Sequence, residues 1–421
     1  MGVISDGTTM IDNGAFEGLA VLSWDTTAKT ANFTAVAGNG YFVNTTSASV
    51  TVTLPASPSA GDQVGIKDYA NTADTNSIDI ARNGSNIQGI AANYQISTEG
   101  GGATLIYVDG TQGWKVISDS QASAIGSFIN ATGGTITTCG NFKIHTFTSP
   151  GTFAVSCAGN PASALADYLV VAGGAGGGSR FAGGGGAGGY RESGGTASGC
   201  YSVSPLGFGV SAFSVSATCY PITVGAGGAG GVATGGCGTG GAGNGTPGGS
   251  SSAFPITSAG GGGGGRGDAG PGLNGGSGGG GAGRFASSAG SGNTPPVSPP
   301  QGNNGGSSNG ADFYSGAGGG GATSVGVNTV AGPGGNGATS FITAAPVTRA
   351  GGGGGGGGGS PSGNGFGDGG PGGGGDGGLA EGSAGTANTG GGGGGGGYVA
   401  PTNRVGGAGG SGIVVIRYKY R

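Results

Sequence analysis

The side chains best suited to contact a partner are aromatic residues and arginines that interrupt long runs of glycine. Aromatic rings offer flat surfaces on which sugar rings or apolar groups can stack, and arginine pairs with phosphate or carboxylate groups. The alternative is that the rings cap the ends of the glycine segments and cover their backbone, while the arginines only solvate the loops. The candidate binding residues are Arg180, Phe181, Arg284, Phe285, Phe313, Tyr314, Phe366, Tyr398 and Arg404.

No set of residues forms a recognisable catalytic or metal site. The single histidine, His145, falls in an expected strand without an obvious Ser or Cys partner, so we interpret it as structural. The acidic residues of the glycine-rich part are scattered rather than paired, as a glycosidase would need them. At this glycine content the dinucleotide-binding pattern G-x-G-x-x-G arises by chance. We therefore expect no catalysis, no metal and no cofactor.

The five cysteines are too few for a disulfide scaffold and odd in number. Cys200 and Cys219 bracket a Ser-, Phe- and Val-rich insertion, and a bridge between them would close that loop. The alternative is that the cysteines are reduced thiols in small buried sites. Cys139, Cys157 and Cys237 suggest no zinc spacing, since there is only one histidine.

Glycine accounts for 118 of the 421 residues, and most of it falls between Gly173 and Gly412. A run of bare glycine has no side chain to bury. It either stays a flexible linker or forms an extended left-handed helix of three residues per turn, whose N–H and C=O groups bond sideways to neighbours. The similar lengths of the runs, the purest being Gly351–Gly359 and Gly390–Gly397, favour the ordered form. We expect stacked polyglycine-II helices in a slab, with loops at both ends.

Residues 1–120 have an ordinary composition and read as β structure. Val50, Val52 and Leu54 alternate with threonine, which is typical of a half-buried strand, and a turn then leads into a return strand that begins near Val64. No convincing amphipathic helix occurs anywhere in the chain. We predict a β-rich N-terminal module over residues 1–120, a linker over 121–141 and a glycine-rich domain over 142–421.

Strand patterns return next to the glycine runs. One strand, Asp167–Ala172, continues directly into Gly173, and the last run continues into Ile413–Tyr418. We infer a small β base, closed by its first and last strands, from which the glycine helices project. The expected fold class is all-β plus irregular structure, with essentially no α-helix.

Charge and hydropathy exclude several partners. Only 8% of the residues are charged and the net charge is −4, so there is no basic field to attract nucleic acid or anionic membranes. The longest apolar runs are far shorter than a membrane span. The start of the chain, Met1–Asp6, lacks the basic and apolar regions of a secretory signal. We expect a protein that is made in a cytoplasm and reaches the outside as part of an assembly.

The bracketing segments follow a recognisable order along the chain. It is carried by Phe147–Phe153, Asp167–Gly174, Gly183–Tyr190, Tyr220–Gly228 and Gly410–Tyr418. Over residues 142–421 this order resembles the glycine-rich receptor-binding domain of bacteriophage tail fibres. The front module is similar to β modules of marine phage fibres. The Tyr190–Cys219 insertion departs from the family's usual pattern.

The resemblance implies a virion tail fibre, made in the host cytoplasm, that attaches the phage to its host. It implies an adhesin with polyglycine-II helices and distal loops that recognise a bacterial surface glycan or outer-membrane protein. A homotrimer and contacts of the N-terminal module with other tail proteins are also expected. Alternatives are a purely structural virion part such as a head fibre or connector, an ice-binding glycine-rich protein, and a substrate-degrading spike.

Overall fold

In a computed structural model the chain folds into two compact units, Met1–Ser127 and Phe128–Arg421. The structure describes residues 22–119, 128–159, 163–195, 197–198, 201–232, 242–267, 269–309, 314–328, 332–358, 365–399 and 402–420. It also describes two short strand pairs, β1 (Ile4–Ser5) with β2 (Thr8–Thr9) and β3 (Ile11–Asp12) with β4 (Ala15–Phe16). All regular elements in the described part of the chain are strands, which confirms the all-β fold class.

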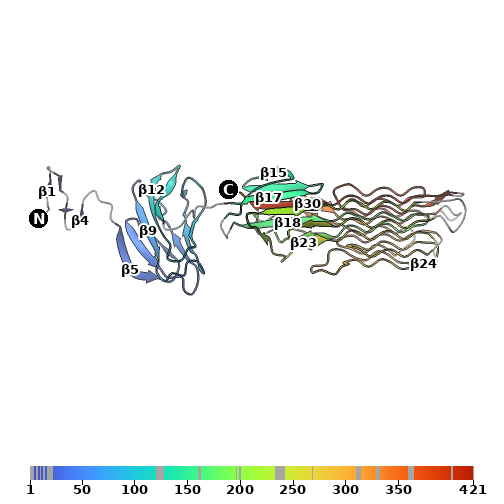
Figure 1. Cartoon of the computed structure of the whole chain (residues 1–421), viewed down its shortest axis with the longest axis horizontal. Coiled ribbons are helices and arrows are strands. Elements are labelled where there is room, and N and C mark those ends of the chain that lie inside the picture. The colour runs from blue at the N-terminus through green and yellow to red at the C-terminus, as the bar shows by residue number, and fades with distance from the viewer. Residues whose placement is uncertain are drawn as a thin grey trace. The chain divides into compact units, whose positions relative to one another are not determined.

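The first unit consists of two facing sheets (Figure 1). The five-stranded sheet has the order β13 (Gly113–Asp119), β12 (Gly102–Asp109), β9 (Gln63–Asp68), β7 (Asn39–Val43) and β5 (Ser23–Lys29). The four-stranded sheet has the order β11 (Tyr94–Ile96), β10 (Ile78–Ala81), β8 (Val50–Thr53) and β6 (Phe33–Thr34). Alternate residues of both sheets, such as Val52, Ile80, Ile66 and Leu105, are buried in one shared core.

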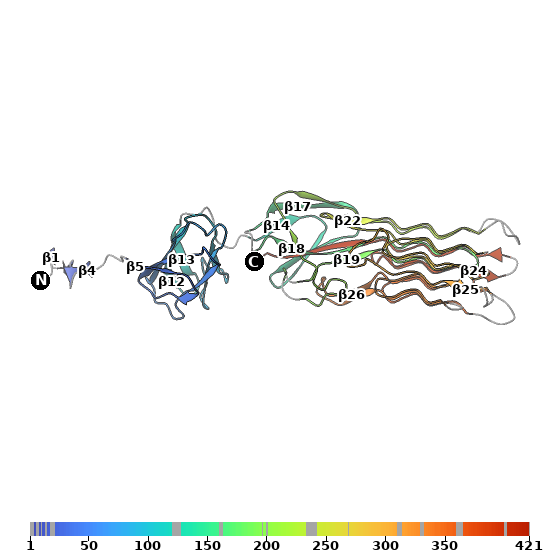
Figure 2. The ribbon, with the colours of Figure 1, turned by 90° about the horizontal axis from the view of Figure 1, so that it is seen from below.

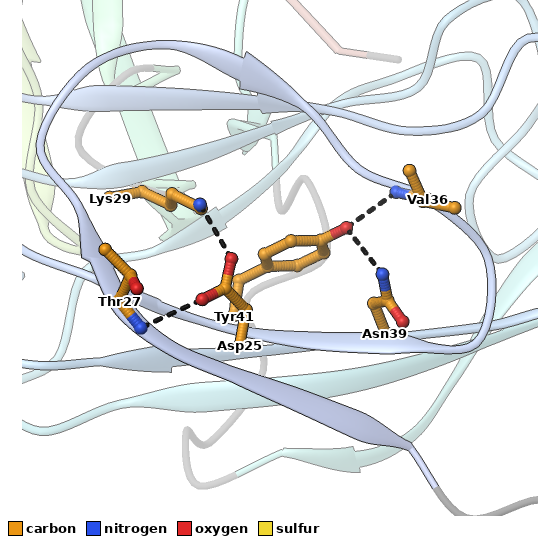
Figure 3. A network of polar contacts seen from close by, with 6 residues as sticks. All are labelled: Asp25, Thr27, Lys29, Val36, Asn39 and Tyr41. Atoms are coloured by element: carbon orange, nitrogen blue, oxygen red, sulfur yellow. Dashed lines mark hydrogen bonds and ion pairs between the residues drawn. The ribbon is translucent and has the colours of Figure 1, made fainter.

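A buried tyrosine stabilises the connection between β6 and β7. The Tyr41 hydroxyl accepts hydrogen bonds from the backbone N–H of Val36 at 2.9 Å and from the side-chain amide of Asn39 at 3.4 Å (Figure 3). The return strand expected near Val64 exists as β9, but it pairs with β7 and β12 of the other sheet rather than with β8. The chain therefore crosses from one sheet to the other at the turn after Thr53.

The second unit begins with a β base of two sheets. The larger has the order β15 (Thr135–Cys139), β16 (Phe142–Phe147), β30 (Ile413–Lys419), β18 (Leu165–Val171) and β19 (Tyr190–Glu192), with β20 (Phe213–Ser214) also paired to β18. The smaller has the order β14 (Asn130–Thr132), β17 (Gly151–Cys157) and β21 (Cys219–Ile222). The last strand of the chain lies between β16 and β18, so one sheet holds both ends of the glycine slab.

Two strands, Asn130–Thr132 and Thr135–Cys139, fall within the segment expected as a linker. β14 pairs with β17, and β15 pairs with β16 from Thr135↔Thr146 to Cys139↔Phe142. The physical reason is the buried side of this segment: Ile129 and Ala131 are 2% and 3% exposed and join the core of the base. The Ser/Ala/Gly/Thr-rich composition of this stretch concealed these few apolar contacts.

His145 is fully buried in β16, and its ring is fixed at both nitrogens. The Gly133 carbonyl, 2.7 Å from Nδ1, can only accept a hydrogen bond, so Nδ1 carries the proton and Nε2 accepts from the Tyr418 hydroxyl at 2.9 Å. Burial lowers the pKa of His145 below its usual 6.5. Below pH 6.5 the unfolded chain therefore binds more protons than the folded chain, and stability is lost as the pH falls.

We expect acidification from pH 7 to pH 5 to lower the unfolding temperature of the wild-type protein more steeply than that of a His145→Gln variant. Glutamine can make the same two hydrogen bonds without titrating, so carboxyl groups common to both proteins cancel in the comparison. The measurement is calorimetry across this pH range. Parallel pH profiles would show that His145 does not contribute.

Beyond the base the chain runs back and forth in extended segments that lie side by side (Figures 1 and 2). The segment Gly173–Gly178 shows how they are joined. Gly173, Gly174 and Ala175 donate to three different segments, at Gly249, Gly410 and Gly186, and the next three residues donate to the same three segments, at Thr246, Gly407 and Gly183. Their carbonyl groups accept from three further segments, at Gly261, Gly228 and Gly393. The helix therefore repeats every three residues and has six bonded neighbours, as polyglycine II requires.

Only glycine fits these central positions. A Cβ atom added at Gly174, Gly184 or Gly355 would lie 2.0, 2.1 or 1.9 Å from a carbonyl oxygen of a neighbouring segment. The long pure runs are thus the centre of the lattice, where a helix is enclosed on all sides. Four short strand pairs lie at the ends of the slab: β22 (Ser251–Ala253) with β23 (Ile256–Ser258), β24 (Ala286–Ser287) with β25 (Ser308–Asn309), β26 (Ala338–Ser340) with β27 (Val347–Arg349), and β28 (Tyr398–Val399) with β29 (Thr402–Asn403).

Candidate functional site

The direction of the glycine helices decides which loops share an end. Gly173–Gly178 leaves the base, and Gly183–Gly189 returns antiparallel to it, since Ala175 bonds Gly186 and Gly178 bonds Gly183. The turn at Arg180–Phe181 therefore lies at the end away from the base, here called the distal end. Figure 1 shows β24 at this end, opposite the base strands β15, β17 and β30.

All the candidate binding residues that the structure describes are at the distal end. Contacts join several of their loops: Arg180 N–H donates to the Arg404 carbonyl at 3.2 Å, and Gly283 N–H, next to Arg284, donates to the Phe181 carbonyl at 2.8 Å. Phe313 lies outside the described residues. Arg180 and Arg404 are more than two hundred residues apart in the sequence. The glycine helices alternate in direction and bring their loops to one surface.

A cluster of three aromatic rings forms the centre of this surface. The Phe181 ring lies between Tyr314 and Tyr398, with ring centroids 4.8 and 5.0 Å away. The Arg180 guanidinium is 5.8 Å from the Phe181 ring and 5.6 Å from the Tyr398 ring, distances typical of cation–π contacts. Phe181 also covers Gly358, where an added Cβ would meet the phenyl ring at 2.3 Å.

Burial divides the candidates into two groups. Phe181 and Arg180 are only 4% and 8% exposed, so they cap the glycine helices instead of offering a free surface. Phe285 and Phe366 are 53% and 45% exposed and do offer one. Arg284 lies 5.3 Å from the Phe285 ring, which places a cation beside an exposed apolar group.

Two exposed side chains at the distal end were missed by the sequence analysis. Leu379 is 41% exposed and packs next to Gly357. Gly365, which precedes Phe366, also lies next to Gly357, so Leu379 and Phe366 belong to neighbouring loops. Val232 is 62% exposed, and its carbonyl accepts a bond from the Ser179 hydroxyl at 3.1 Å. Each is a single aliphatic residue that directly follows a glycine run. This position in the sequence could have identified both as residues of the distal end.

The distal surface thus combines a fixed aromatic centre with exposed apolar side chains around it. We define it by Phe285, Phe366, Leu379 and Val232, with Arg284 beside them. Such a surface suits recognition through apolar contact and an occasional charge. Among the described residues, no group of three or more His, Cys, Asp or Glu side chains could hold a metal ion, and no helix could cross a membrane.

Comparison with known families decides how the second unit is classified. Residues 147–419, more than half of the chain, match the model of the glycine-rich domain. The chain belongs to the glycine-rich domain family. No curated protein matches it. The match begins at the last residue of β16 and ends at the last residue of β30, so this glycine-rich domain comprises most of the β base together with the slab.

The Tyr190–Cys219 insertion of the glycine-rich domain lies at the base and away from the distal surface. Its Ser193 hydroxyl and Ser198 N–H donate to the buried Asp167 carboxylate of β18 at 2.7 and 2.9 Å. These bonds tie the insertion to the central sheet. Cys219 is exposed, and Cys200 lies outside the described residues, so the bridge between them stays a prediction.

A second buried carboxylate anchors the same insertion. Glu192 is 2% exposed and accepts hydrogen bonds from the Tyr190 hydroxyl at 2.9 Å, from Ser204 N–H at 3.0 Å and from the Ser340 hydroxyl. Burial raises the pKa of Glu192 above its usual value. All three partners lie at the base end of the domain. Glu192 therefore stabilises the base and takes no part in the distal surface.

Proposed function

We propose that this protein is a bacteriophage tail fibre whose glycine-rich domain binds a receptor on the bacterial surface through the distal surface. The observation that carries the proposal is the gathering of exposed apolar side chains at one end of a backbone-bonded slab. A slab of this kind needs no hydrophobic core, so its end loops are free to vary in sequence while their positions stay fixed. Binding without catalysis fits the side chains present.

The proposal includes the assembly that the resemblance implies. The protein is part of the virion, forms a homotrimer and attaches to other tail proteins through its N-terminal module. Its receptor is a surface glycan or an outer-membrane protein. The competing function is that of a structural virion part, whose distal surface would contact other virion proteins instead of the host.

The test is a triple variant, Phe285→Ser, Phe366→Ser and Leu379→Ser, in the full-length protein. We expect at least a tenfold loss of binding to cells of the host bacterium, because the exposed apolar contacts are removed. Exposed substitutions usually change stability by less than about 0.5 kcal/mol, so the fold should persist. The measurement is the binding of labelled protein to host cells, and competition with phage adsorption.

The matched control is Phe208→Ser. Phe208 is 84% exposed in the base insertion of the same domain, so this change removes a still more accessible ring from the opposite end. It should bind host cells as the wild type does. Normal binding by the triple variant would refute the proposal, and a defect of the triple variant in particle assembly alone would favour the structural function.

A further inference from the structure

The first unit carries an exposed tryptophan on the outer face of its five-stranded sheet. Trp24 in β5 is 42% exposed, whereas Trp114 is fully buried in the core. In the register of the sheet Trp24 pairs with Gly40, and Gly40 pairs with Gly65. The same row continues from Gly65 to Thr104 of β12 and from Thr104 to Ser118 of β13. One line of residues thus crosses all five strands, with an indole at one end, two glycines next and two hydroxyls at the far end.

The two glycines leave room for the side chains of Trp24 and Leu22. A Cβ added at Gly40 would lie 2.5, 2.7 and 2.7 Å from three indole carbons, Cδ2, Cε2 and Cε3. Nearly equal distances to three ring atoms mean that the face of the ring, not its edge, lies on Gly40. At Gly65 the added Cβ would meet the Leu22 side chain at 2.6 Å and the nearest indole carbon at 3.3 Å. The indole therefore lies flat over Gly40, with its edge and Leu22 next to Gly65, and Trp24 stays 42% exposed.

Neighbouring groups hold this orientation. The Phe42 ring is 5.1 Å from the Trp24 ring, tilted by 40°. Directly after Trp24 the pairing of β5 with β7 shifts between Asp25 and Lys29, and these two side chains form an ion pair of 2.7 Å. Thr27 N–H also donates to Asp25, at 2.9 Å (Figure 3). The hydrogen bonds from Lys29 and Thr27 lower the pKa of Asp25 below its usual value.

A hollow of about 220 Å³ opens beside the indole. Its lining includes Trp24, Lys67, Gly102, Thr104 and Ser118. Lys67 donates one hydrogen bond to the Gly100 carbonyl, and an ammonium group has three donors, so it can make others. The hollow is smaller than the roughly 300–1,000 Å³ of sites for drug-sized ligands. It combines an apolar platform with hydroxyl and ammonium groups at its rim.

We propose that this row is a glycan-binding site that takes one sugar residue. A pyranose has C–H groups on its face and hydroxyls around its edge. Its face would stack on the Trp24 indole, and its hydroxyls would bond the side chains of Thr104, Ser118 and Lys67. A second copy of this chain is the other candidate occupant. It fits less well, because two of the five residues in the row are polar and a stable interface buries about 800 Å² per partner.

This site is separate from the distal surface, so either can fail without the other. The test uses the full-length protein and a panel of soluble probes: cellotetraose, chitotriose, mannotriose and galactotriose. Trp24 and Trp114 are the only tryptophans of the chain, and Trp114 is buried. A change in tryptophan emission on titration therefore reports mainly on Trp24. We expect a saturable change with at least one probe.

Variants then locate the site by calorimetry with that probe. Trp24→Ala should weaken binding at least tenfold, and Thr104→Ala combined with Ser118→Ala at least threefold. The control is Phe208→Ser, an exposed position outside both proposed sites, which should bind the probe as the wild type does. The proposal is overturned if no probe gives saturation or if Trp24→Ala binds normally. It is also overturned if Trp24→Ala lowers the oligomer mass in light scattering, since the face would then join copies of the chain.

Discussion

Replacing Gly355 with alanine is expected to lower the unfolding temperature of the glycine-rich domain by several degrees. The new methyl group would lie 1.9 Å from the Gly316 carbonyl oxygen. The neighbouring helix cannot move aside easily, because Gly316 also donates its own N–H to Gly356. Overpacking of a close-packed interior costs about 1–3 kcal/mol, and in a domain of this size each kcal/mol corresponds to about 2 °C.

The matched control is Gly365→Ala. Gly365 lies at the distal end, outside the close-packed part of the slab, and an added Cβ there would have no atom within 4 Å. Both substitutions replace glycine by alanine in the same domain, so they change the freedom of the unfolded chain alike. Scanning calorimetry of the full-length protein is the measurement. If the two variants unfolded at the same temperature, close packing of the glycine helices would not be what stabilises the domain.

Much of the slab could be predicted from the sequence, because its chemistry is simple. A pure glycine run that is ordered has no side chains to block its neighbours, and Gly351–Gly357 and Gly390–Gly397 are buried throughout. Proline inside a run carries further information, since it has no N–H to give a neighbour. Pro247, Pro333 and Pro371 all occupy exposed positions, where the lattice ends. A run interrupted by proline therefore belongs to the edge of the slab.

The sequence predicted several residues of the candidate site, but not which of them are exposed. Arg180-Phe181 and Arg284-Phe285 are the same dipeptide at the end of a glycine run, yet Phe181 is 4% exposed and Phe285 is 53% exposed. The difference arises because the first pair turns beside the loops that carry Tyr314 and Tyr398. Local sequence does not contain the neighbours that the lattice supplies. For the same reason the sequence did not predict the partners of β9, which are set by long-range packing in the first unit.

Hydrogen exchange should show a three-residue period in helices at the edge of the slab. In Gly225–Gly231, the N–H groups of Gly228 and Gly231 donate to Gly174 and Gly177 at 2.9 and 2.8 Å. Ala226 and Ala229 are exposed and donate to no residue in the described part of the chain. We expect the two glycine amides to exchange at least a thousandfold more slowly than the two alanine amides, as amides released only by large-scale opening do.

The central run provides the contrast within the same experiment. Every amide from Gly351 to Gly357 donates to a neighbouring helix, at 2.8 to 3.1 Å, so the whole run should be slow, without a period. Exchange measured residue by residue, by NMR or by mass spectrometry with fragmentation, would separate the two patterns. Uniformly fast exchange in both runs would mean that lateral bonds do not hold the slab. The distal surface would then have no fixed shape, because its side chains rest on no other core.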